Sequence, residues 1–112
     1  VEHRVASKML EDAKGQIWLS NGDNQLVKIH KPKSEWQVSK IDFIEALYVP
    51  LILDGQLLVS TENGLFHWND KNNETAGKVA WFYDYFGNEA EPPTFLHRDA
   101  QQRVWLSWQI KT

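Results

Sequence analysis

The 112-residue chain has no cysteine, which excludes a disulfide framework, a thiolate metal site and a cysteine nucleophile. Its 12 lysines and arginines are scattered among 15 acidic residues, and the net charge of −3 argues against DNA, RNA and acidic lipid headgroups as partners. No apolar run approaches the roughly 20 residues that span a bilayer. What is present is an ordinary globular composition, 42% hydrophobic and 24% charged, with six tryptophans.

Most of the tryptophans lie in short runs of β-branched and apolar residues that are separated by turn residues. The Asn-Gly-Asp-Asn cluster at residues 21–24 and Asp54-Gly55 are such turns. Helical periodicity is poor, although residues 39–49 keep a spacing that would also suit a helix. We therefore predict an all-β chain, with strands near residues 16–20, 25–30, 36–41, 46–53, 57–60, 64–68, 78–83, 94–97 and 103–108.

An internal repeat orders these strands. Residues 12–20 match residues 99–107 without a gap. Residues 54–60 match both segments once the two residues that follow the aspartate in those segments are left out. The serine that ends each segment recurs after 40 and then 47 residues, at Ser20, Ser60 and Ser107. A period of this length with four short strands per unit is typical of a β-propeller blade.

Each unit places a turn before a second strand that carries a large apolar residue. In that turn the aspartate is expected to cap the backbone and the glycine to adopt a positive φ. Trp18 and Trp105 are expected to fill the core between blades, each burying roughly 150–250 Å². The prediction is a partial β-propeller of about two and a half four-stranded antiparallel blades: residues 1–43, residues 44–88, and the first two strands of a further blade in residues 89–112.

Fewer than three blades leave two open faces, because propellers close with roughly four to eight. The chain is therefore expected to belong to a longer parent protein or to complete a ring by self-association. Its first residue is Val1 and not methionine, which also suggests a processed or excised piece.

The pattern Asp-x-x-Gly-x-Ile-Trp-Leu-Ser at residues 12–20, with Asn-Gly-Leu-Phe-His-Trp-Asn at residues 63–69, resembles the two-component regulator propeller repeat. The chain departs from that pattern where Ser20-Asn21 and Ser107-Trp108 replace Gly-Thr, where Leu58 replaces tryptophan, and where Gln102 replaces the turn glycine. The resemblance implies a ligand-sensing module in the periplasmic or extracytoplasmic portion of a bacterial membrane receptor, such as a hybrid histidine kinase or a diguanylate cyclase.

Catalytic and metal-binding patterns are weak. The chain has four histidines, His3, His30, His67 and His97, and their spacing matches no zinc motif. We therefore expect no metal site and no cofactor. The repeated serines lack a nucleophile elbow. Paired carboxylates such as Glu89 and Glu91 would serve a glycosidase only if held a few ångströms apart, and they are read as loop residues. We therefore do not expect an enzyme.

Ligand binding is expected where the turns after the second strands and the loop between blades, residues 85–89, share one face. Asparagines, acids and aromatic rings suit saccharide recognition, although turn geometry alone also explains the polar residues. The candidate ligand-binding residues are Asn21, Asp23, Asn24, Glu62, Asn63, Tyr85 and Trp108. The function hypotheses are a sensor for an oligosaccharide or other small ligand, a scaffold whose rim docks a protein, and a polysaccharide-active propeller enzyme.

Overall fold

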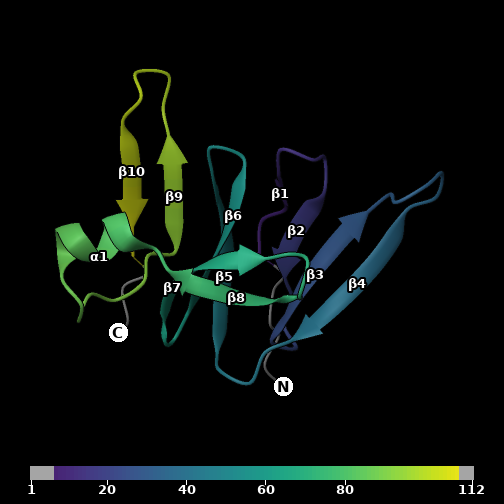
Figure 1. Ribbon diagram of the computed structural model, residues 1–112, viewed down its shortest axis with the longest axis horizontal. Helices are drawn as coiled ribbons and strands as arrows, with labels where there is room; N and C mark the ends of the chain where they lie inside the picture. Colours follow the sequence, from purple (N-terminus) through teal and green to yellow (C-terminus); the bar gives the residue numbers. More distant parts are fainter. Residues whose placement is uncertain (1–6, 109–112) are drawn as a thin grey trace.

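The computed structural model describes residues 7–108, which form two four-stranded antiparallel sheets, a two-stranded hairpin and one short helix (Figure 1). Sheet 1 follows chain order with β1 (Leu10–Glu11), β2 (Ile17–Ser20), β3 (Gln25–His30) and β4 (Gln37–Asp42). Sheet 2 has the same order with β5 (Leu47–Leu53), β6 (Gln56–Thr61), β7 (Gly64–Asn69) and β8 (Glu74–Lys78). Helix α1 (Ala80–Phe86) precedes the hairpin of β9 (Phe95–Arg98) and β10 (Val104–Ser107). The expected four-stranded antiparallel sheets are thus confirmed.

Two apolar clusters join these three units in chain order. Trp18, Leu26 and Val59 pack between sheets 1 and 2, and each is at most 1% exposed. Sheet 2 packs on the hairpin through a second cluster, to which Leu58 and Leu96 belong. The first strands of the units, β1, β5 and β9, contact one another in the same order. The described residues form an open stack and no closed ring of sheets (Figure 1).

The strand predicted at residues 78–83 is wrong beyond Lys78, which ends β8. The fourth strand of sheet 2 is β8, and the aromatic residues after it form α1. Helical spacing places Phe82 against the apolar cluster between sheet 2 and the hairpin, where it is fully buried, and Tyr83 lies beside it. Val79 precedes the helix and is buried in the same cluster. Burial of this face therefore outweighs the strand preference of the aromatic residues.

Residues 39–49, where a helix remained an alternative, belong to strands β4 and β5 and the connection between them. Pro50 is tolerated inside β5 because β5 is the edge strand of sheet 2 and pairs with β6 alone. Within the described residues, α1 is too short to cross a bilayer, and no longer apolar helix is present.

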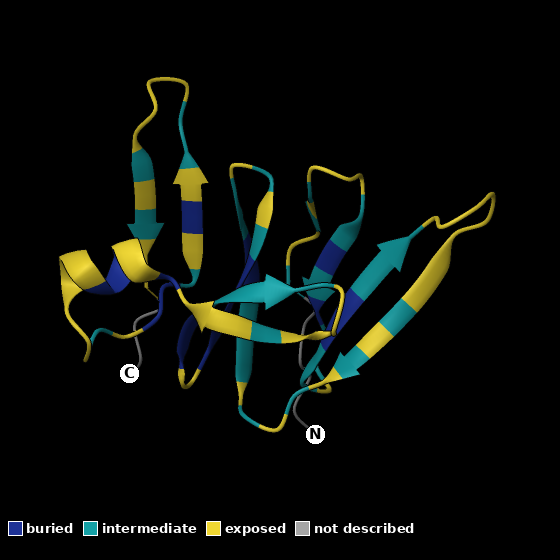
Figure 2. Cartoon of the chain, viewed as in Figure 1, coloured by how far each residue is buried: buried dark blue, intermediate teal, exposed yellow. Residues whose placement is uncertain are grey.

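The two tryptophans expected in the core have different environments. Trp18 on β2 is 1% exposed, because it packs against sheet 2. Trp105 occupies the equivalent position on β10, but it is 54% exposed, because no described element follows the hairpin to cover it (Figure 2). The expectation of a buried Trp105 is therefore wrong for the described chain, and the difference follows from its place at the end of the stack.

Candidate functional site

The turn between β2 and β3 holds three of the expected ligand-binding residues and is built by its own side chains. The Asn21 Oδ1 atom accepts hydrogen bonds from the backbone N–H groups of Asp23 and Gln25, at 3.0 and 3.1 Å. The Asn21 amide nitrogen donates to Gln25 Oε1 at 2.9 Å. Asp23 is exposed at the tip of the turn. Asn21 therefore fixes the loop and leaves Asp23 the more accessible polar group.

Asn24 connects this turn to the segment between the two sheets. Its side-chain nitrogen donates to the carbonyl oxygens of Phe43 and Glu45, at 2.9 and 2.8 Å. Its Oδ1 atom accepts the N–H of Leu47 at 2.7 Å. The residue adopts φ 60°, a conformation that asparagine tolerates better than most residues do. Through these contacts the Asn24 amide links sheet 1 to the segment that leads into sheet 2.

The turn between β6 and β7 reaches the same connecting segment. Glu62 Oε1 accepts the backbone N–H of Ala46 at 3.1 Å, and the Asn63 side-chain nitrogen lies 3.5 Å from Glu45 Oε2. Both Glu62 and Asn63 are exposed. The two turns lie at one edge of the stack (Figure 1). Residues 43–47 thus contact three of the expected residues, Asn24, Glu62 and Asn63, whereas the hydrogen bonds of Asn21 and Asp23 lie within their own turn.

A hollow of about 250 Å³ lies at this edge, between the β2–β3 turn and the start of β5. Its walls are polar on the turn side, through Asn21 and Asn24, and include Tyr48 and Val49 from β5. At the hollow, Ser20 Oγ donates to the carbonyl oxygen of Tyr48 at 3.3 Å. The size and polar lining suit a small polar ligand or a single sugar ring better than a large apolar one.

The remaining two expected residues belong to an aromatic cluster at α1. Phe86 lies between Tyr85 and Trp108, with ring centroids at 4.9 Å from the first and 5.4 Å from the second. Tyr85 is 82% exposed and Trp108 is 39% exposed. The Trp108 indole N–H donates to the carbonyl oxygen of Glu91 at 2.6 Å, which fixes the ring against the segment before β9.

We call this surface the aromatic platform and define it by Trp81, Tyr85, Phe86 and Trp108. Tyr85 and Phe86 lie in the expected inter-blade stretch and Trp108 was expected as well, whereas Trp81 was not. Trp81 and Phe86 are both 40% exposed, and helical spacing places Trp81 and Tyr85 on one side of α1. Three carboxylates accompany it, Asp84, Glu89 and Glu91, and residues 79–96 contain no lysine or arginine. Recognition of α1 as a helix would have revealed the platform.

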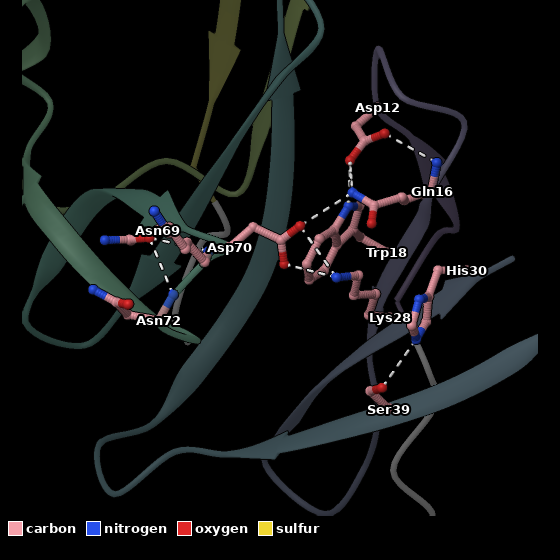
Figure 3. Close-up of polar contacts among 10 residues, drawn as sticks. Asp12, Gln16, Trp18, Lys28, His30, Ser39, Asn69, Asp70 and Asn72 are labelled. Atoms are coloured by element: carbon pink, nitrogen blue, oxygen red, sulfur yellow. Dashed lines mark hydrogen bonds and ion pairs between the residues drawn. The ribbon is translucent and has the colours of Figure 1, made fainter. Parts of the chain in front are cut away.

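A polar network at the opposite edge of sheets 1 and 2 contains no residue expected to bind ligand (Figure 3). Asp70 of sheet 2 accepts from Lys28 Nζ at 2.9 Å and from Gln16 Nε2 at 3.2 Å, both from sheet 1. Gln16 Nε2 also donates to Asp12, and the Trp18 indole N–H donates to Asp12 at 2.9 Å. The partial burial of these groups indicates that the network holds the two sheets together.

Asp12 acts in this network as the predicted turn cap. Its Oδ1 atom accepts the backbone N–H groups of Lys14 and Gln16, and Gly15 adopts the predicted positive φ, at 79°. Burial raises the pKa of the Asp12 carboxyl, but the hydrogen bonds from Trp18 and Gln16 outweigh burial and hold the pKa below its ordinary value. Asp12 is therefore an ionised structural residue.

The described histidines are dispersed. His30 Nε2 lies 3.2 Å from Ser39 Oγ, and the His97 ring lies beside Phe95. Among residues 7–108, no group of three or more histidines and acids is placed to hold a metal ion. His3 lies outside the described residues.

Comparison of the chain with protein-family models, with curated proteins and with solved structures gives no match.

Proposed function

We propose that this chain is part of a β-propeller of the two-component regulator type and serves as a ligand-sensing module without catalysis of its own. Two four-stranded sheets and a hairpin stacked in chain order, with their first strands adjacent, support the propeller. In this proposal the sensor lies in an extracytoplasmic part of a membrane receptor, and rearrangement of the propeller transmits the signal. The repeat pattern described above is what supports the receptor context.

The observation that carries the ligand-binding proposal is the aromatic platform with its three acidic neighbours. The rings are steeply inclined to one another, at 69° for Tyr85 and Phe86 and 79° for Phe86 and Trp108, so a single exposed ring such as Tyr85 offers the flat apolar face for a sugar ring. Carboxylates accept hydrogen bonds from sugar hydroxyls.

Tyr83 of α1 bonds to Leu65 at the start of β7, so the exposed Glu62 and Asn63 of the adjacent β6–β7 turn supply further polar groups for a ligand. Three acids accompany the rings, and the adjacent cation, Lys78, lies over the Tyr83 ring at 4.9 Å, so we propose a neutral oligosaccharide and not an anionic one as the ligand class.

A binding experiment on the whole chain tests this function. An array of neutral and anionic oligosaccharides identifies a bound glycan, and calorimetric titration then measures its affinity. We expect Tyr85→Ala to weaken binding about tenfold or more, equivalent to about 1.4 kcal/mol. Trp36→Ala is the matched control, because Trp36 is another exposed aromatic residue, 57% exposed, in the β3–β4 loop away from the platform.

Two results would contradict the ligand proposal. One is an array on which no neutral oligosaccharide binds, and the other is an equal loss of affinity in the Trp36→Ala control. Either result would favour the second candidate function, a protein-interaction scaffold, which the exposed aromatic residues of the hairpin also support: Phe95 at 47% and Trp105 at 54% exposure.

A further inference from the structure

The outer face of the β9–β10 hairpin repeats a surface that is buried elsewhere in the chain. Strand pairing places Trp105 opposite His97 and Ser107 opposite Phe95, so these four side chains share one face, and all four are exposed (Figure 2). Leu96 and Leu106 point the other way, into the cluster shared with sheet 2. We call the exposed face the trailing face, defined by Phe95, His97, Trp105 and Ser107.

In sheet 1 the equivalent trailing residues already have a partner. Trp18, the equivalent of Trp105, packs edge-on against Trp68 of sheet 2, with ring centroids 6.4 Å apart and planes at 70°. Leu57 of sheet 2 packs on the same cluster. In this chain, therefore, a tryptophan on the second strand of a unit packs on apolar residues of the next sheet where one follows, here Trp68 and Leu57.

Sheet 1 carries the equivalents of those receiving residues at the other end of the stack. The repeat aligns Ile17 with Leu57 and Ile29 with Trp68. Ile17 pairs with Ile29, and Ile29 pairs with Val38, which places the three on one face, away from Trp18. Val38 is 60% exposed, although it continues this apolar row. We call this the leading face, defined by Ile17, Ile29 and Val38.

We propose that two copies of this chain associate head to tail, with the trailing face of each copy packed on the leading face of the other. The contact would repeat the packing between sheets 1 and 2, with Trp105 in the place of Trp18 and Ile29 in the place of Trp68. Two copies contribute four four-stranded sheets and two two-stranded hairpins, and the four complete sheets already reach the lower end of the roughly four to eight blades of closed propellers. A heterologous contact that closes in this way forms a ring and not a fibre.

The trailing face is ordered for this contact before a partner arrives. The Trp105 indole N–H donates to Asp99 Oδ2 at 2.8 Å, as Trp18 donates to Asp12, and the Arg103 guanidinium lies 5.5 Å from the Trp105 ring centre. A side chain that is held in its bound position loses less entropy on association. The inference depends on the propeller arrangement proposed above, but not on the ligand.

Complementing variants test the head-to-tail arrangement on the whole chain. In sedimentation velocity we expect a dimer for the unmodified chain and monomers for Trp105→Asp and for Val38→Asp separately. Each variant keeps one intact face, so an equimolar mixture should recover a dimer that holds one copy of each. Ile44→Asp is the control and should remain dimeric, since Ile44 is fully exposed in the connection between β4 and β5 and belongs to neither face. Circular dichroism establishes that every variant is folded.

If Val38→Asp fails to fold, Val38→Lys replaces it in the same mixture, because the exposed edge of β4 accepts a long charged side chain. An unmodified chain that stays monomeric at several hundred micromolar would overturn the proposal and leave both faces to further sheets of a longer protein. A dimer that no mixture of folded variants restores would also overturn it. Neither result touches Tyr85 or Trp108, so the ligand proposal would stand or fall separately.

Discussion

Single residues of this chain repeat their contacts wherever the repeat recurs. Asp99 Oδ1 accepts the backbone N–H groups of Gln101 and Arg103, and its Oδ2 accepts the Trp105 indole, just as Asp12 does in the first repeat. The first example is partly buried and the second is exposed. The arrangement is therefore local: an aspartate six residues before a tryptophan closes the turn without help from tertiary packing.

The Asp99 contacts make a pH prediction. The hydrogen bond from Trp105 is the largest of the contributions that lower the pKa of Asp99 from 3.8 to about 2. A carboxyl with a lowered pKa stabilises the fold above the unfolded value, near pH 4, and that contribution is lost as the pH falls through about 2. We expect the Trp105 indole N–H signal in NMR spectra to shift with a midpoint near pH 2. A midpoint near pH 4 would contradict the hydrogen-bonded carboxylate.

At the scale of elements, the sequence predicts strands better than it predicts the helix. Strands β2, β3 and β6 were predictable because short apolar runs end at turns with asparagine, aspartate and glycine. Helix α1 was not, because Trp81, Phe82 and Tyr83 also favour strands, and only burial against sheet 2 decides between the two. The candidate site likewise has a part that was predictable from the local sequence and a part that was not. Its polar turns follow from the repeat, whereas the aromatic platform depends on α1.

Tyr83 fixes α1 to sheet 2, and a glycine makes room for it. The Tyr83 hydroxyl accepts the N–H of Leu65 at 2.8 Å, and a Cβ atom on Gly64 would lie 2.5 Å from that oxygen. Gly64 also has φ +137°. We expect Gly64→Ala to lower the free energy of unfolding by about 2 kcal/mol or more, because it strains the backbone and breaks a buried hydrogen bond.

Urea denaturation of the whole chain measures this effect, and the control is Gly77→Ala. Gly77 lies on β8, its φ is not positive, and a Cβ atom there would meet nothing within 4 Å. The control should change stability by a few tenths of a kcal/mol at most. Similar stabilities for the two variants would show that Tyr83 does not hold the helix in place.

At the scale of the whole molecule, two separate apolar clusters divide the stack. One joins sheets 1 and 2 around Trp18, and the other joins sheet 2, α1 and the hairpin around Phe82 and Leu96. Sheet 2 belongs to both clusters. Units that contact only their neighbours in a row have stabilities set by those neighbour interfaces. The hairpin has two strands and one covered face, so it is the unit most easily opened.

Leu96→Ala should therefore loosen one end of the molecule first. Leu96 is 7% exposed, and its truncation should cost about 2–3 kcal/mol, the lower part of the range for buried leucines, because an end hairpin can adjust around the gap. In native-state hydrogen exchange we expect faster exchange in β9, β10 and α1, while β2 and β3 keep their protection. Trp18→Ala is the matched experiment, since it should instead loosen the contact between sheets 1 and 2. Equal acceleration along the whole chain in both variants would mean that the clusters unfold as one, and the stacked units would then be thermodynamically inseparable.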